Sequence, residues 1–343
     1  MNIQRWGKLG LLATVVALMF SSCDSAIYDY EGDCSVNYQV KFRYDMNMKF
    51  ADAFPNAVKS VKLFAFDQSG TLVAIEEESD ASKLSKLDQF GNPGYFMPLN
   101  VKPGTYDLIA WGGLGNQESF ELLGNPTIGV TKKADIQAKM RRADAVVDKD
   151  LNPLFHGMTT SVTLPDEPGW HTTIVPLMKN TNIIRVVLQH LSLDEVDPNM
   201  FDFAITDNNG WMAYDNNLVE DETLTYKPWR VDGVKAGIDA DGENEVGAAI
   251  AEFTIGRMME SHKDTMFLTV FNKKKGEKVF SIPIIDYVML VKGEYNQAMS
   301  NQEYLDRQDE YNMTFFLDES ERWMNAYIYI NSWRVVINHS TIE

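Results

Sequence analysis

Two cysteines near the N-terminus are the residues best placed for covalent chemistry. Cys23 and Cys34 lie eleven residues apart within "FSSCDSAIYDYEGDCSV", and the chain of 343 residues holds only these 2 cysteines. Such a pair could close a disulfide, bind a metal ion or carry an attached group. The residues that precede Cys23 distinguish between these possibilities.

A lipoprotein signal peptide accounts for the start of the chain. Arg5 and Lys8 precede the apolar residues 9–20, a run too short to cross a bilayer of about 30 Å as a helix. The run suits the apolar part of a secretory signal, and two serines follow it directly before Cys23. We therefore expect the lipoprotein peptidase to remove residues 1–22. The alternative is an ordinary signal peptide with a chance cysteine.

Acylation of Cys23 would attach the chain to a membrane permanently, because two or more acyl chains bury many methylene groups at about 0.8 kcal/mol each. Residues 23–35 then form a lipidated tether, which reaches at most about 40 Å when fully extended. An acylated Cys23 cannot pair with Cys34. We expect Cys34 to be a small buried thiol, with an intermolecular bridge as the alternative.

No other residues have the spacing of a zinc site, a nucleophile elbow or a phosphate-binding loop, and a glycosidase pair of carboxylates, which acts by its separation in space, would leave no spacing to detect. "DADGENE" at 239–245 resembles part of a calcium loop, but it lacks the complete series of ligands and the closing glutamate. We interpret it as an exposed acidic loop, with cation binding as the alternative. The sequence therefore predicts no enzyme, no cofactor and no bound metal. The five histidines are scattered, without a pair at zinc-ligand spacing, at His156, His171, His190, His262 and His339.

The charge balance argues against nucleic acid as a partner. The chain holds 31 basic and 49 acidic residues, a formal charge of −18. Loss of Arg5 and Lys8 with the signal peptide leaves 29 − 49 = −20 for the mature chain. A surface of this sign repels phosphate backbones and anionic headgroups.

Alternation of apolar and polar residues predicts an all-β protein. Residues 36–44 place an apolar side chain at every second position, which is typical of a strand with one buried face. Helical patterns are limited to 134–142 and to a segment that opens with the capping box Ser300–Glu303 and continues to about Glu310. Many short strands with regular turns indicate antiparallel β-sandwiches. Similar strand patterns recur at 61–66, 105–111, 183–188, 266–271, 279–285, 313–317, 326–330 and 333–337.

The length and a faint internal repeat favour two similar domains in tandem. "LFAFDQSG" at 63–70 and "FAITDNNG" at 203–210 both run a strand into Asp-x-x-Gly, 140 residues apart. "LPDEPGWHT" gathers prolines and acids, so we expect a boundary near 160–175. The expected domains are 36–165 and 172–343, each a β-sandwich.

Several motifs in the mature chain resemble the FimB/Mfa-like fimbrial anchor family of Bacteroidales-type bacteria. The resemblance runs from about Cys23 to Asn338, and its most specific motifs are "YDMNMKFADAF" and "QEYLDRQDEYN". The final motif commonly reads Asn-Gly-Trp in that family, whereas this chain has Asn331-Ser332-Trp333. In order, the motifs are "YQVKFRYDMNMKFADAFPNAVKSVKLFAFDQSGTLV", "VKPGTYDLIAWGGL", "PLFHG", "LMKNTNIIRVVLQ", "QEYLDRQDEYNMTFFLD" and "INSWRVVIN".

The resemblance implies a surface-exposed lipoprotein of the outer membrane with two transthyretin-like β-sandwich domains and Cys23 as the lipidated residue. It implies that the protein anchors a fimbrium to the cell, limits its length and binds fimbrial stalk subunits. A surface lipoprotein that binds glycans is the alternative. A platform of exposed aromatic side chains would favour glycan binding, and an open groove or an unpaired strand edge would favour the anchor.

The resemblance also implies that a protease cuts related stalk subunits after an arginine near the N-terminus and removes their first strand. Between Cys23 and Tyr44 the only arginine here is Arg43, at the end of the expected first strand. A cut there would discard the lipid and the strand together. We therefore expect the mature anchor to keep residues 23–43.

Replacing Cys23 tests the proposed anchor. We expect Cys23→Ala to release the protein from the membrane fraction, since no later segment offers eighteen uninterrupted apolar residues. Cells are labelled with a fatty-acid analogue, and label is compared between wild type and variant. Equal label on both proteins would refute acylation at Cys23. Label found on Cys34 would show that Cys34 is the acylated residue.

Overall fold

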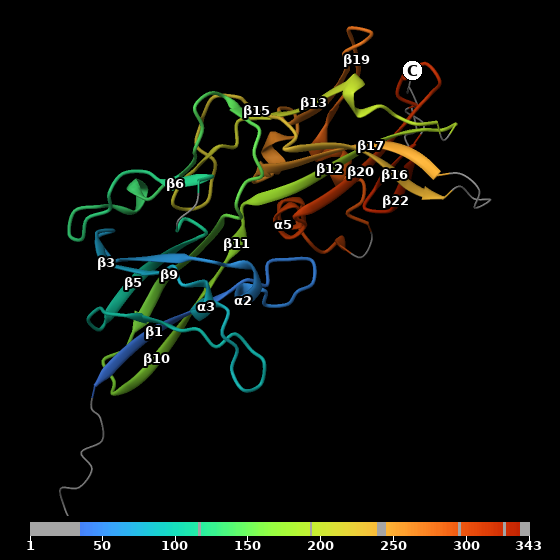
Figure 1. Cartoon of the computed structure of the whole chain (residues 1–343). Coiled ribbons are helices and arrows are strands. Elements are labelled where there is room, and N and C mark those ends of the chain that lie inside the picture. Colours follow the sequence, from blue (N-terminus) through green and yellow to red (C-terminus); the bar gives the residue numbers. More distant parts are fainter. Residues whose placement is uncertain are drawn as a thin grey trace, which may run out of the picture.

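The computed structural model describes residues 35–115, 118–192, 194–238, 245–293, 296–324 and 327–336. It shows two β-sandwiches side by side, with β11 (Met178–Lys179) between them (Figure 1). The predicted all-β class is confirmed, because strands dominate and the helices are few and short. None of the described helices combines the length and the apolar character that a membrane span requires.

The first sandwich contains two sheets. Sheet A has the strand order β10-β1-β4, and sheet B has the order β11-β9-β5-β2-β3. β1 lies parallel to β10 and antiparallel to β4. The elements are β1 (Val36–Arg43), α2 (Phe54–Ala57), β2 (Val61–Phe66), β3 (Leu72–Glu78), α3 (Ala81–Leu84), β4 (Met97–Leu99), β5 (Gly104–Gly112), β9 (Phe155–Leu164), β10 (Gly169–Pro176) and β11.

The second sandwich also contains two main sheets. Sheet C has the order β16-β17-β12-β20-β21-β22, sheet D has the order β19-β18-β13-β15-β8, and a small sheet β14-β7-β6 adjoins them. Sheets C and D use β8 (Val146–Val147), β12 (Thr181–His190), β13 (Phe201–Asp207), β15 (Leu224–Tyr226), β16 (Arg230–Ile238), β17 (Glu245–Gly256), β18 (Phe267–Asn272), β19 (Glu277–Pro283), β20 (Glu310–Leu317), β21 (Tyr327–Ile330) and β22 (Trp333–Val336). The remaining elements are β6 (Phe120–Leu122), β7 (Ala138–Met140), β14 (Trp211–Met212), α4 (Ile284–Met289), α5 (Asn301–Arg307) and the 3-10 helices η1 (Lys133–Asp135), η2 (Pro198–Met200) and η3 (Glu260–His262).

The two sandwiches share one pairing scheme. In each, one strand lies between a parallel and an antiparallel neighbour: β1 between β10 and β4, and β12 between β20 and β17. The antiparallel pair β2–β5 likewise corresponds to β13–β18. "LFAFDQSG" and "FAITDNNG" fall on β2 and β13 and the turns that follow them, so the two halves of the sequence repeat occupy equivalent places.

The turn in "LPDEPGWHT" does not divide the two sandwiches. It connects β9 to β10, and β10 pairs with β1 over eight residue pairs from Val36↔Gly169 to Arg43↔Pro176. Residues 172–176, expected in the C-terminal domain, therefore lie in sheet A of the first sandwich. Apart from β8, which joins sheet D from the chain before β9, the strands of sheets C and D begin with β12 at Thr181. We propose that the domain boundary falls at 177–180.

The two predicted helices had different outcomes. α5 begins after Ser300, whose hydroxyl accepts the Glu303 N–H at 3.0 Å, as the capping box predicted. The helix predicted at 134–142 is wrong: only η1 is helical there, and β7 follows at once. β7 pairs with β6 and β14, so pairing with neighbours from distant parts of the chain overrode the local helical pattern.

The central strands β2 and β5 of sheet B are buried on both faces, which joins the two sandwiches into one body. On β2, Leu63 and Ala65 pack in the core between sheets A and B. Phe64 and Phe66 point to the opposite face and pack in a second core that also contains residues of sheets C and D. Trp111 of β5 packs in the same second core and is fully buried. One sheet thus serves two cores.

Candidate functional site

The residues singled out in the sequence lie mostly outside the described part of the chain. Cys23, Cys34, His339 and residues 239–244 are not among the described residues. Within the described ranges, no group of three His, Cys, Asp or Glu side chains is arranged to hold a metal ion. The lipidation of Cys23 and the cation alternative for the acidic loop therefore stay predictions.

The four described histidines lie apart and have different partners. His262 Nδ1 lies 2.9 Å from the carboxylate of Asp207, whose side chain is fully buried. His171 Nε2 donates to the Glu167 carbonyl at 2.8 Å, and His190 is buried at the end of β12. His156 alone contacts both sandwiches, because its ring packs against Trp111 while Nε2 donates to the Tyr214 carbonyl at 2.8 Å.

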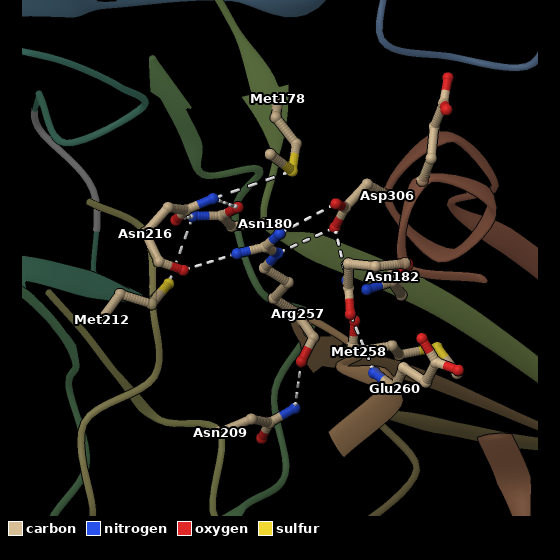
Figure 2. A network of polar contacts seen from close by, with 12 residues as sticks. Met178, Asn180, Asn182, Asn209, Met212, Asn216, Arg257, Met258, Glu260 and Asp306 are labelled. Atoms are coloured by element: carbon tan, nitrogen blue, oxygen red, sulfur yellow. Dashed lines mark hydrogen bonds and ion pairs between the residues drawn. The ribbon is translucent and has the colours of Figure 1, made fainter. Parts of the chain in front are cut away.

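A buried polar network crosses the junction between the sandwiches (Figure 2). Asn180, in the segment between β11 and β12, exchanges two amide hydrogen bonds with Asn216, at 2.6 and 3.0 Å. Both amides are almost fully buried. The pair therefore fixes the segment that connects the sandwiches to the loop after β14.

Arg257 is the centre of this network. Its Nη1 donates to the Asn216 carbonyl at 2.5 Å, while Nε and Nη2 donate to the two carboxylate oxygens of Asp306, each at 2.9 Å. The two side chains are each only 8% exposed. A planar guanidinium suits this two-pronged contact, and a buried charge pair of this kind requires all its hydrogen bonds. Arg257 thus joins the end of β17 to α5 and to the loop that contacts Asn180.

Residues of α5 and of the segment after it also contact the first sandwich. Arg307 Nη1 donates to the Asp45 carbonyl at 3.0 Å, and its guanidinium lies 4.6 Å from the ring centre of Phe50. Lys179 of β11 lies 2.6 Å from the Asp309 carboxylate just after α5. The motifs "YDMNMKFADAF" and "QEYLDRQDEYN", more than 250 residues apart in the sequence, therefore meet at this junction.

The contacts at the junction hold the two sandwiches in one arrangement. Burial of apolar side chains along sheet B stabilises the contact between the two sandwiches. The network around Arg257 adds directional hydrogen bonds, and another arrangement of the sandwiches would leave its buried polar groups unpaired. No charge or spacing rule marks Asn180, Asn216 or Arg257 in the sequence. The quoted motifs contain other residues of the junction, since Asp45 lies in "YDMNMKFADAF" and Asp306 in "QEYLDRQDEYN", but Asn216 and Arg257 lie in none of them.

Breaking the network at Arg257 tests this role. We expect Arg257→Met to lower the free energy of unfolding by about 3–5 kcal/mol, because it leaves the buried Asp306 carboxylate unpaired. Lys62→Met is the matched control, since its pair with Glu77 is partly exposed to solvent and worth at most about 1 kcal/mol. Urea unfolding measures both. Equal losses for the two variants would show that the network does not stabilise the junction.

Burial makes His156 sensitive to pH. Burial is the main cause that lowers the pKa of His156 from 6.5 to about 4. The unfolded imidazole gains a proton below about pH 6.5, while the folded one resists until about pH 4. The stability that His156 contributes is therefore complete above pH 6.5 and is lost as the pH falls towards 4, by at most about 3 kcal/mol.

His156→Gln, which keeps an N–H donor for the Tyr214 carbonyl, should remove this part of the pH dependence. Unfolding free energies measured from pH 7.5 to 4 are compared with those of wild type. Curves that stay parallel across the range would contradict the assignment.

Comparison with known proteins places this architecture in a family. The family model for "Fimbrillin-A associated anchor proteins Mfa1 and Mfa2" matches residues 30–339. A search of curated protein sequences found no significant match. The structure of a candidate adhesin from Bacteroides thetaiotaomicron is similar, with 34% identity and a TM-score of 0.79 over 90% of this chain and 100% of the other.

Two further structures are also similar. A candidate polysaccharide-binding protein of Bacteroides thetaiotaomicron has 31% identity and a TM-score of 0.75, with 89% and 99% of the two chains covered. The fimbrial anchor protein Mfa2 of Porphyromonas gingivalis has 16% identity and a TM-score of 0.65, with 88% and 99% covered, and this likeness shows the fold alone. The chain accordingly belongs to the Mfa2 family of fimbrillin-A associated anchor proteins.

Proposed function

We propose that this protein is an outer-membrane lipoprotein that anchors a fimbrium to the cell surface, limits its length and binds a stalk subunit. Membership of the Mfa2 family supports a role associated with fimbriae. The expected lipid on Cys23 would supply the attachment to the membrane. The protein is proposed to act by binding, without catalysis.

The placement of β1 is the observation that carries the proposal. β1 follows the expected tether directly and lies inside sheet A, between β10 and β4. Val40 and Phe42 of β1 are buried in the core between sheets A and B. Removing this strand would open that core. A lipid-bearing segment that continues into a strand paired along its whole length with β10 is suited to a permanent anchor.

The surroundings of Arg43 support retention of the first strand. The Arg43 carbonyl accepts the Leu177 N–H at 2.7 Å, and the next residue, Tyr44, donates its N–H to the Asp52 carboxylate at 3.0 Å. A protease that needs an extended substrate would have to break these bonds and free β1. We therefore propose that the mature protein keeps residues 23–43.

Glycan binding is the second candidate, and the description of one similar structure favours it. The two most exposed tryptophans among the described residues, Trp170 and Trp333, are each 62% exposed but lie on β10 of sheet A and β22 of sheet C. They belong to different sandwiches and do not form one flat platform. The anchor is therefore the better supported function.

Removal of the gene from fimbriated cells tests the proposal. We expect fimbriae to be shed into the medium and to lengthen, because the contact that holds and terminates them is missing. Electron microscopy measures their length, and the shed fraction is compared with that of cells complemented with the wild-type gene. Mass spectrometry should find the mature N-terminus at Cys23. Attached fimbriae of unchanged length would refute the anchor, and an N-terminus at Tyr44 would refute retention of β1.

A further inference from the structure

The open edge of β10 is an unusual feature of the first sandwich. β10 pairs only with β1 among the described strands. Gly169 and Leu177 donate their N–H groups to the Ser35 and Arg43 carbonyls, on the side of β1. Because backbone groups alternate between the two edges of a strand, Trp170, Thr172 and Ile174 direct theirs to the open edge. Thr159 of β9 donates its hydroxyl to the Ile174 carbonyl at 3.3 Å. The N–H groups of these three residues and the carbonyls of Trp170 and Thr172 have no partner among the described residues.

β10 lacks the features that protect other edge strands. Edge strands normally carry charged residues or prolines, or stay very short, because an unprotected edge pairs with another chain. β10 has eight residues, contains no Asp, Glu, Lys or Arg, and has a proline only at its end. The other sheet edges in the described part of the chain carry charges or have at most three residues: β3 with Glu76–Glu78, β16 with Arg230 and Asp232, β19 with Glu277 and Lys278, β22 with Arg334, β4 with three residues, and β8 and β11 with two.

The neighbouring strand extends this uncharged flank. β9 contains no charged residue over its ten residues, and only Asp166 and Glu167 in the connecting turn are charged. Trp170 is 62% exposed and Ile174 is 47% exposed on the outer face of β10. A chain with a formal charge of −18 thus keeps one flank almost free of charge and rich in residues that favour strands.

We propose that an extended segment of the fimbrial stalk subunit binds this flank by adding to β10 as a further strand of sheet A. An added strand would pair with the open N–H and C=O groups along the edge together, and apolar side chains at alternate positions of that segment would cover Trp170 and Ile174. A second copy of this chain is disfavoured as the occupant, because two bodies of the same strongly negative charge repel each other. The inference rests on the proposed anchor function. Binding of the added strand leaves β1 in its place between β10 and β4.

Thr172→Pro tests the added strand. Proline removes the Thr172 N–H, which points to the open edge, and leaves the bonds between β10 and β1 intact. Trp170→Lys is a second variant, because a lysine on an edge opposes pairing. Val231→Lys is its matched control, since Val231 is an exposed apolar residue on the edge strand β16 of the other sandwich. Melting temperatures establish that each variant is folded.

We expect the two β10 variants to lower the amount of stalk subunit retained on cells by about tenfold or more, which corresponds to losing one or two hydrogen bonds of the added strand. Val231→Lys should retain the wild-type amount. If a folded Thr172→Pro protein retains as much as Val231→Lys, the β10 edge is not the contact, and the anchor function can still hold. If deletion of the whole gene changes nothing, the anchor function itself fails.

Photo-crosslinking identifies the occupant without relying on the variants. A benzoylphenylalanine at position 172 of the full chain in fimbriated cells should join to an extended segment of the stalk subunit, and the same probe at position 231 should not. A crosslink between two copies of this chain would overturn the proposal in favour of self-association. Absence of a stalk crosslink at position 172 would also overturn it.

Discussion

Burial of both faces of β2 and β5 in sheet B is the constraint on which the remaining structure depends. An antiparallel sheet can leave one face in water, but the second face of β2 carries Phe64 and Phe66, which are both fully buried. Burying a phenylalanine side chain contributes about 1.5–3 kcal/mol, so these side chains must be covered. The small sheet β14-β7-β6 and the second sandwich cover them. The relative placement of the two sandwiches follows from this need.

Polar contacts at the junction restrict the relative placement of the two sandwiches more tightly than apolar burial does. Apolar surfaces are tolerant of small shifts, whereas the two-pronged contact of Arg257 with Asp306 and the amide exchange of Asn180 with Asn216 are not. Their loss in any other arrangement would leave buried groups unpaired. Arg307 of α5 makes a similar directional contact with the Asp45 carbonyl, just after β1. A side chain of the second sandwich therefore fixes the backbone that follows the first strand of the first sandwich.

Local alternation predicted the all-β class and strands such as β1, β5 and β12, because one-sided burial imposes a period of two, but it left out long strands such as β9, β10, β16 and β17. Local alternation is less informative for strands that are buried on both faces and for strands whose partners lie far away in the sequence. "LFAF" in β2 breaks the alternation, since both faces of sheet B are covered, and β7 replaces a helix because its partners come from β6 and β14. Prolines and acids mark any exposed turn, so the composition of the β9–β10 turn does not distinguish a domain boundary from a connection within one sandwich. The network around Arg257 depends on contacts between residues far apart in the sequence, which no local pattern records.

The parallel pairing of β1 with β10 determines how the molecule carries mechanical load. A pull on the residues that precede Val36 acts along the axis of β1, so it slides the strand lengthwise past β10 and β4. In that geometry the load is shared by the backbone hydrogen bonds that join β1 to β10 and to β4. These hydrogen bonds do not break one after another from one end of the strand. β12 lies between β20 and β17 in the same way. A lengthwise pull on β12 would therefore meet the same kind of shear resistance in the second sandwich.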